Sequence, residues 1–196
     1  MTGFSYVICG RQPTADSVPL FQALSSLLNQ HKGKSMTSAR EKSAAARVDA
    51  ISLLKADHRQ VEALFSDFER AINDAKKQQL ASMICAALTI HTTIEEEIFY
   101  PAFMEATGDR DVHHEAVVEH DSARKLMAEI ESMSPADDYF DASVSVLSEM
   151  IRHHVKEEEK AGGMFSEARK SDIDLKSLGE KLLARKQELQ SQSKAA

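Results

Sequence analysis

The segment HTTIEEEIFY, residues 91–100, decides how the rest of this chain folds. It places His91 and Glu95 four residues apart, and on a helix that spacing brings both side chains to one face. Aliphatic residues share this face, so we expect it to point into a core; they are Ile84, Ala87, Leu88, Ile98 and Ala102. A histidine and a carboxylate buried among aliphatic groups cost free energy unless they pair or bind a partner.

A second segment, HHVKEEE at residues 153–159, repeats this arrangement with His154 and Glu158. The residues that share its face are also mostly apolar, namely Leu147, Ile151, Ala161 and Phe165. One such pair could be satisfied by its own hydrogen bond. Because two pairs occur in one small domain, a bound metal ion is the simplest common partner.

The overall composition favours helices and excludes several classes of protein. The chain has 196 residues, of which 42% are hydrophobic, which is enough for one buried domain with tails. It contains no Trp, 7 Gly and 4 Pro, and long stretches have no turn residue. The net charge of −7 argues against nucleic-acid binding and against electrostatic attachment to a membrane.

The cysteines and the N-terminal residues bear on the cellular compartment. Cys9 and Cys85 cannot form a disulfide framework, and no apolar run is long enough to span a membrane. The first residues lack the features of a secretory signal peptide. We therefore expect a cytoplasmic protein that is a monomer or a homodimer and has either Met1 or Met36 as its start.

Helical periodicity predicts an all-α fold: an up-down-up-down four-helix bundle with an accessory C-terminal helix and a loosely structured N-terminal extension. The four main helices are expected at about 48–76, 77–106, 111–133 and 135–160, and the accessory helix at about 173–189. Ile72 is assigned to the apolar stripe of the first helix, and Pro101 is expected to end or kink the second. The predicted domains are a flexible extension (1–46), the bundle (47–170) and a C-terminal helix with its tail (171–196).

Each main helix carries one histidine on its apolar stripe: His58, His91, His120 and His154. The spacing between the first two is 33 residues and that between the last two is 34. The phrases that contain them are also similar, so the helices form two copies of one hairpin. Packing the two hairpins about a pseudo-two-fold axis would bring the four histidines and the two glutamates to one centre.

Four histidines and two carboxylates are too many ligands for a single tetrahedral zinc ion. They suit two metal ions that share bridging glutamates and an oxo or hydroxo group. Nitrogen and oxygen ligands without thiolate favour iron or manganese over softer metals, although ligand type alone does not choose between the two. We expect two iron ions, with manganese or zinc as weaker alternatives. The predicted ligands are His58, His91, Glu95, His120, His154 and Glu158.

At these residues the chain resembles the hemerythrin-like, or HHE cation-binding, family. The resemblance rests on ADHRQVEALF, HTTIEEEIFYP and HHVKEEE and covers about residues 48–166. It implies an oxygen-bridged di-iron site inside a four-helix bundle. The roles known in the family range from oxygen carriage to oxygen, redox or iron sensing and to peroxide or nitrosative-stress handling, which implies O2, peroxide or NO as the small ligand.

The third helix departs from the invertebrate oxygen carriers, which have a His-x3-His pair there. Four residues before and after His120 stand Ala116 and Arg124. The fifth histidine of those carriers is therefore missing or is replaced by His113 or His114, which argues against simple reversible oxygen carriage.

Three functions follow from this sequence. The first is a non-catalytic di-iron protein that binds or senses oxygen, or that responds to iron or redox state. The second is a di-iron enzyme that decomposes peroxide or reacts with nitric oxide, and the third is a metal-free helical interaction domain. We expect Tyr100 to pack in the core, with an approach to the site or to its access path as the alternative. We expect surface positions for Glu62, Glu96, Glu97, Glu157 and Glu159, with a contact to a metal ligand as the alternative for one of the last four.

Overall fold

The computed structural model describes residues 49–195, and the predicted N-terminal extension, with both candidate start methionines, lies outside the described residues. Over this range the chain is helical and contains no strand. The helices are α3 (Ala50–Arg70), α4 (Asp74–Ile94), the π-helical turn η1 (Glu95–Phe99), α5 (Tyr100–Thr107), α6 (Arg110–Ser132), α7 (Phe140–Glu159), α8 (Met164–Lys170) and α9 (Leu175–Ala195). Among residues 49–195, no helix has the length and apolar character needed to cross a membrane.

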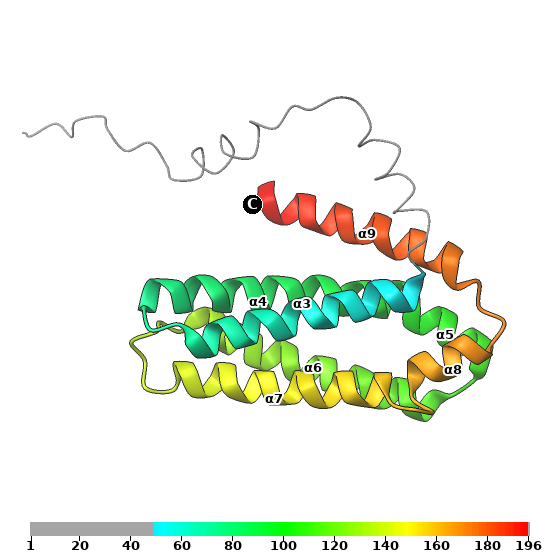
Figure 1. Ribbon diagram of the computed structural model, residues 1–196, viewed down its shortest axis with the longest axis horizontal. Coiled ribbons are helices and arrows are strands. Elements are labelled where there is room, and N and C mark those ends of the chain that lie inside the picture. Colours follow the sequence, from blue (N-terminus) through cyan, green and yellow to red (C-terminus); the bar gives the residue numbers. More distant parts are fainter. Residues whose placement is uncertain (1–48, 196) are drawn as a thin grey trace, which may run out of the picture. The chain divides into compact units, whose positions relative to one another are not determined.

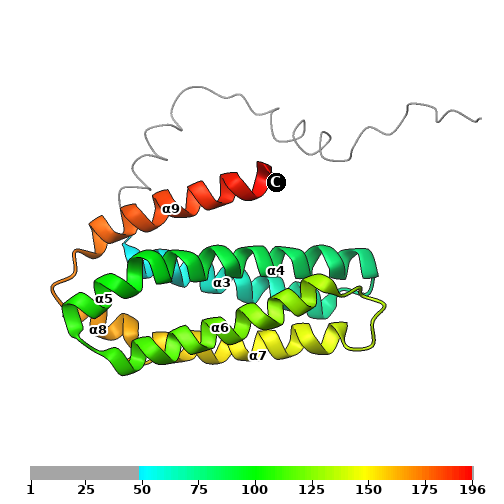
Figure 2. The same cartoon turned by 180° about the vertical axis from the view of Figure 1, so that it is seen from behind.

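Helices α3, α4, α6 and α7 lie side by side and alternate in direction, as Figures 1 and 2 show from opposite sides. The hairpin of α3 and α4 packs against the hairpin of α6 and α7. The short helices α5 and α8 contact each other at one end of the bundle, and α9 lies outside it against α3 and α4. The predicted all-α fold, a four-helix bundle with an accessory C-terminal helix, is confirmed.

Polar residues fix where three of the main helices begin. Asp49, Asn73 and Asp109 are the N-caps of α3, α4 and α6. Each side chain accepts a hydrogen bond from the backbone N–H three residues further on, at 2.8, 3.1 and 3.3 Å respectively. Such a cap contributes about 1 kcal/mol, because it satisfies a donor that the helix itself cannot pair.

The predicted first helix was too long. Helix α3 ends at Arg70, because Ala71 adopts an extended backbone and Asn73 then caps the next helix. Ile72 therefore lies in the connecting turn and is 99% exposed, so its assignment to the apolar stripe was wrong. Pro101 does not end the second helical segment, which continues through η1 into α5.

The fourth main helix begins later than predicted, at Phe140. The side chain of Asp137 accepts a hydrogen bond from the backbone N–H of Ser134 at 2.6 Å, and this turn competes with helix formation. At the other end, Gly163 allows the chain to fold back from α7 into α8. A Cβ at that position would collide with the backbone carbonyl of Glu157 and lie 2.8 Å from that of Glu158.

The interior of the bundle is divided into two apolar clusters. One contains residues from the helix segments 61–68, 80–88, 123–130 and 140–155. The other contains residues from 50–54, 94–103 and 164–168 together with Leu178 and Leu182 of α9. On all four main helices, the predicted site residues lie at the boundary between these two clusters. The site is therefore a polar layer enclosed by apolar side chains on both sides.

Two neighbouring residues of α7 test the importance of this packing. Leu147 is fully buried, whereas Val146 is 49% exposed. We expect Leu147→Ala to lower the free energy of unfolding by about 2–5 kcal/mol, because it leaves a cavity in the core. Val146→Ala should change it by no more than about 0.5 kcal/mol. Urea denaturation of both variants measures the difference, and equal losses would contradict the described orientation of α7.

Candidate metal centre

The structure brings all six predicted ligands together in the polar layer. They come from four helices, and each is at most 4% exposed. The residues are His58 on α3, His91 and Glu95 at the junction of α4 and η1, His120 on α6, and His154 and Glu158 on α7. These six side chains converge from both hairpins.

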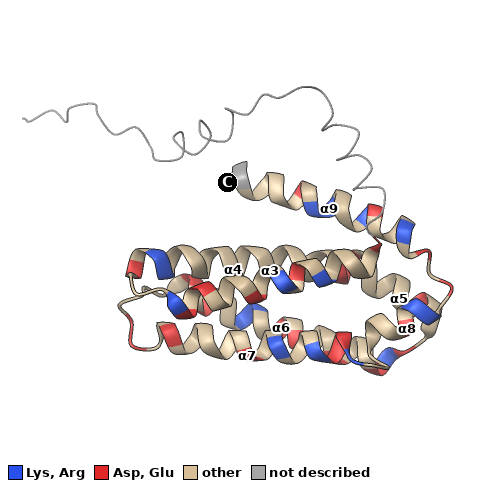
Figure 3. Cartoon of the chain, in the orientation of Figure 1, with Lys and Arg blue, Asp and Glu red and all other residues tan. Residues whose placement is uncertain are grey.

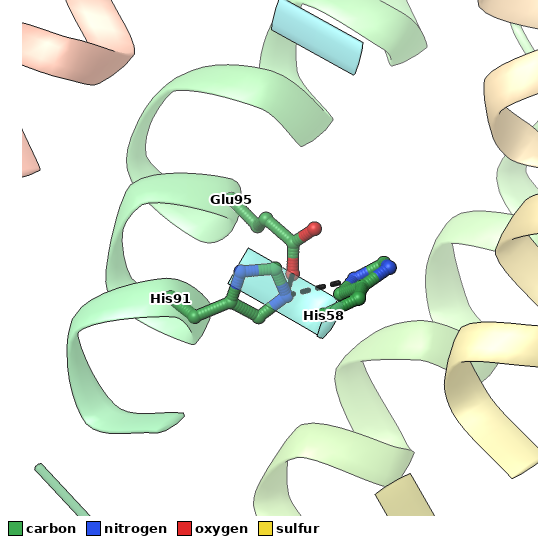
Figure 4. Close-up of side chains that lie close together, drawn as sticks. All are labelled: His58, His91 and Glu95. Atoms are coloured by element: carbon green, nitrogen blue, oxygen red, sulfur yellow. Dashed lines mark hydrogen bonds and ion pairs between the residues drawn. The ribbon is translucent and has the colours of Figure 1, made fainter. Parts of the chain in front are cut away.

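In the first half of the layer, the imidazoles of His58 and His91 face each other, with their Nε2 atoms 3.1 Å apart. Figure 4 shows this contact and the carboxylate of Glu95 beside it. Glu95 Oε2 lies 3.2 Å from His91 Nε2, and Glu158 Oε2 lies 3.4 Å from His58 Nε2. Two nitrogens and two carboxylates thus converge on this half.

The second half has the same composition. The Nε2 atoms of His120 and His154 are 3.3 Å apart. Glu95 Oε2 lies 3.4 Å from His120 Nε2, and Glu158 Oε2 lies 3.6 Å from His154 Nε2. Each glutamate therefore lies between the two histidine pairs, which is the position that a carboxylate bridging two metal ions requires.

The other ring nitrogen of each histidine faces an acidic side chain. Nδ1 of His58 is 2.8 Å from Glu159, Nδ1 of His120 is 2.8 Å from Glu96, Nδ1 of His154 is 2.7 Å from Glu119, and Nδ1 of His91 is 3.8 Å from Asp57. Because a carboxylate can only accept, a neutral imidazole in this position carries its proton on Nδ1. Its Nε2 then presents a lone pair to the centre of the layer, as metal-binding histidines do.

Without a cation, this layer would be electrostatically unfavourable. Burial lowers the pKa of His91 to about 4 and that of His120 to about 2, so both are neutral at neutral pH and present lone pairs to facing nitrogens. Burial and the neighbouring Glu158 carboxylate raise the pKa of Glu95. The buried atoms Glu95 Oε1 and Glu158 Oε2 also lack any hydrogen-bond partner. Bound cations would remove all of these conflicts at once, so the residues present fit a pair of metal ions.

The outer carboxylates correct two expectations. The surface was the preferred expectation for Glu96 and Glu159, with a contact to a ligand as the alternative for one glutamate, but both contact a histidine of the centre. Asp57 and Glu119 were not identified at all. The positions of all four outer carboxylates follow the repeat. Asp57 and Glu119 directly precede a histidine of the layer, and Glu96 and Glu159 directly follow a glutamate of the layer. The pairing crosses between helices, however, and periodicity along one helix cannot show that.

Basic side chains hold several of these outer carboxylates in place. Arg124 Nη1 lies 2.7 Å from Glu96 Oε1, and Lys186 of α9 pairs with Asp57. Arg59 and Lys55 of α3 both pair with Glu159. The surface assignment of Glu97 and Glu157 agrees with their contacts, since they pair with Arg185 and Lys160 rather than with a histidine of the layer.

Tyr100 is a further member of the layer: it is buried in the core, as expected, and it also approaches the site, which was the alternative expectation. Its hydroxyl lies 3.3 Å from His120 Nε2, 3.3 Å from Glu158 Oε1 and 3.4 Å from Glu95 Oε2. In a regular α-helix, residues five apart point about 140° away from each other. Here the wider π-helical turn bonds the backbone N–H of Tyr100 to the carbonyl of Glu95, which brings the two side chains to the same side.

The two remaining candidates for a fifth histidine lie outside the layer. His113 is half-buried and packs edge-on against the ring of Tyr100, with ring centroids 5.7 Å apart. His114 is exposed on α6. The structure therefore places neither imidazole among the six converging groups.

Comparison with known proteins identifies the family. Residues 49–161 match the model of the hemerythrin HHE cation-binding domain. The chain belongs to the hemerythrin HHE family. A crystal structure of a hemerythrin HHE cation-binding domain-containing protein from Mycobacterium kansasii has the same fold, with a TM-score of 0.64 and 22% identity over 74% of this chain and 89% of that one.

A DNA nickase from Nostoc sp. is also similar, with 29% identity over 107 residues. The matched part is 55% of this chain, but the chain spans only 30% of the nickase. The family assignment and the two clusters of histidine and glutamate support cation binding by this hemerythrin-type domain.

Adjacent glutamates of η1 test the role of the outer carboxylates. Glu96 contacts His120, whereas Glu97 points to Arg185 of α9. We expect Glu96→Gln to weaken metal binding by about 10–100-fold, because a neutral amide oxygen is a weaker acceptor than the carboxylate and no longer raises the basicity of the imidazole. Glu97→Gln is the matched control and should leave the affinity unchanged. Competition against a chelator of known affinity measures both, and equal affinities would contradict this role of Glu96.

Proposed function

We propose that this hemerythrin-type domain is a non-haem di-iron protein that binds or senses oxygen, or that responds to iron or redox state. The observation that carries the proposal is the pair of facing imidazole contacts, at 3.1 and 3.3 Å, with a glutamate oxygen between the two pairs on each side. The donor set contains only nitrogen and oxygen, which suits iron better than softer metals.

Under this proposal, the ligands of the two ions are the six residues predicted from the sequence. His58 and His91 would hold one ion, His120 and His154 the other, and the glutamates would be shared. Bound iron would supply reversible redox chemistry and an open coordination position for a small ligand. The apolar clusters on both sides of the layer exclude bulk water, and this strengthens every electrostatic interaction within it.

A cavity between α6 and α7 supports a small, weakly polar ligand such as O2 or NO. Its volume is about 180 Å³, and it reaches His120 and His154 of the layer. Its apolar lining comes from Val118, Ala123, Met150 and Ile151. A diatomic ligand needs no charged partner to occupy such a space, whereas a large polar substrate would lose its hydration there.

The remaining aspects of the proposal rest on composition. We propose that the protein acts in the cytoplasm, as a monomer or homodimer, and without a nucleic-acid substrate. The net charge of −7 disfavours contact with phosphates, and the similarity to the nickase covers less than a third of that protein. The metal-free alternative is disfavoured by the cation-binding family and by the buried glutamate oxygens of the layer that have no hydrogen-bond partner.

Metal analysis of the iron-loaded protein tests the proposal. We expect two iron ions per chain in the wild type, and a clear loss in Glu95→Ala and in Glu158→Ala, because each variant lacks a shared ligand. Glu62→Ala is the control, since Glu62 pairs with Arg59 outside the layer. Mass spectrometry of the metal and the visible spectrum in air measure the outcome. Two ions retained in both glutamate variants, or none bound by the wild type, would overturn the ligand assignment.

The second candidate function, a di-iron enzyme that decomposes peroxide or reacts with nitric oxide, is favoured by Tyr100. Its hydroxyl is the one side-chain O–H group that the described residues place among the converging ligands. Burial and the nearby Glu95 carboxylate raise the pKa of Tyr100, so it stays protonated. It can therefore donate a hydrogen bond or a proton to an oxygen atom held between the histidine pairs.

Replacement of this hydroxyl separates the two candidates. If the protein is an enzyme, the iron-loaded wild type will turn over hydrogen peroxide. Tyr100→Phe will then keep both iron ions but lose about 100-fold in rate, as expected when a general acid is removed. Peroxide consumption at matched iron content measures this. No turnover by the wild type would exclude the enzyme, and equal rates would exclude Tyr100 as the acid.

A further inference from the structure

A cavity separate from the metal centre lies at the end of the bundle where α3 ends and α4 and α7 begin. It has a volume of about 190 Å³ and is lined by side chains of these three helices. None of the residues that line it belongs to the metal centre. Figure 3 shows acidic and basic residues at this end of the bundle, where α4 and α7 begin. The cavity is therefore a feature that the metal centre does not explain.

The inner part of this cavity is apolar. Phe65 and Phe68 of α3 and Val144 of α7 line it, and all three side chains are buried. Because these side chains form no hydrogen bonds, water molecules beside them would lose hydrogen bonds that they make in bulk water. An apolar cavity of about 150 Å³ stays dry and binds benzene, so the space in this protein accommodates one aromatic ring.

A polar group lies beside this apolar part. Ser148 of α7 lines the cavity and is 3% exposed, and its hydroxyl has no hydrogen-bond partner among the described residues. A serine in a helix can donate to the carbonyl four residues earlier, as Ser82 and Ser122 do at 3.0 and 2.9 Å. Since a buried hydroxyl without a partner is unfavourable, this position favours a bound molecule that brings one polar group to Ser148.

The charges at the mouth of the cavity compensate each other. Lys77 and Asp141 line the mouth and form an ion pair. Glu69 also lines it, and its Oε1 lies 3.0 Å from Nη2 of Arg152 on α7. Each of these charges has an opposite partner, and a charged ligand would lose hydration inside the cavity without gaining a partner of its own. The cavity therefore favours an uncharged ligand.

We propose that this cavity is a binding site for a small uncharged molecule that has one aromatic ring and a hydroxyl group. The ring packs against Phe65 and Phe68, and the hydroxyl of the ligand shares a hydrogen bond with Ser148. This site goes beyond the proposed di-iron function and does not depend on it, because the two sites share no residue.

Fluorine NMR titrations of the full-length protein with para-fluorophenol and para-fluorotoluene test this site. The two probes have nearly the same shape, but only the first carries a hydroxyl group. Ser148→Ala removes the buried hydroxyl of the protein. Ser145→Phe adds a ring at an exposed residue that lines the cavity. Ala142→Phe is the matched control, because Ala142 is exposed on the same helix and does not line the cavity.

We expect saturable binding of para-fluorophenol to the wild type and to Ala142→Phe, and its loss in Ser145→Phe. Ser148→Ala should weaken binding of para-fluorophenol by about two- to tenfold, as expected for one hydrogen bond, without weakening that of para-fluorotoluene. Absence of saturable binding to the wild type would overturn the site, and so would equal binding to Ser145→Phe and Ala142→Phe. Equal affinities of the wild type and Ser148→Ala for para-fluorophenol would overturn the recognition of a hydroxyl group.

Discussion

The arrangement of this bundle depends on one constraint. Imidazole lone pairs and carboxylates are buried together at its centre, and positive charge must compensate them. Four imidazoles turn their Nε2 atoms toward one another in a layer that is almost completely closed to water, and burial lowers the pKa of two of them, His91 and His120. Two glutamates enter the same layer from opposite hairpins. In a low-dielectric interior such a set is unfavourable on its own and favourable around cations. The apolar clusters on either side exclude water from the layer, so water cannot take the place of the cations.

The outer ring of carboxylates ties this layer to the rest of the molecule. Each histidine faces an acidic residue from a different helix, and basic residues of the bundle hold some of these acids in turn. The ring also extends to the accessory helix, because Lys186 of α9 pairs with Asp57 beside His91. Helix α9 therefore does more than cover apolar surface on α3 and α4. It contributes a charge to the shell that orients one of the proposed ligands.

Much of this architecture could be predicted from the sequence, but with characteristic errors. The apolar stripes predicted the helices, and the repeated His-x3-Glu spacing predicted which six groups converge, because each spacing is a property of a single helix. The ends of helices were less accurate, since turns such as that around Asp137 depend on local hydrogen bonds that compete with helix formation. Ile72 was assigned to the first helix because it continues the helical spacing, but helix α3 ends at Arg70, before that residue.

Periodicity along a helix fixes which residues share a face, so the bundle, its two-hairpin repeat and the six inward groups follow from the sequence alone. Tertiary packing sets which acidic residue meets which histidine, because those pairs join different helices. It also decided the role of Tyr100, whose hydroxyl reaches the layer through the wider turn of η1. A regular α-helix would have turned this side chain away from Glu95, and residue spacing alone does not reveal where a helix widens.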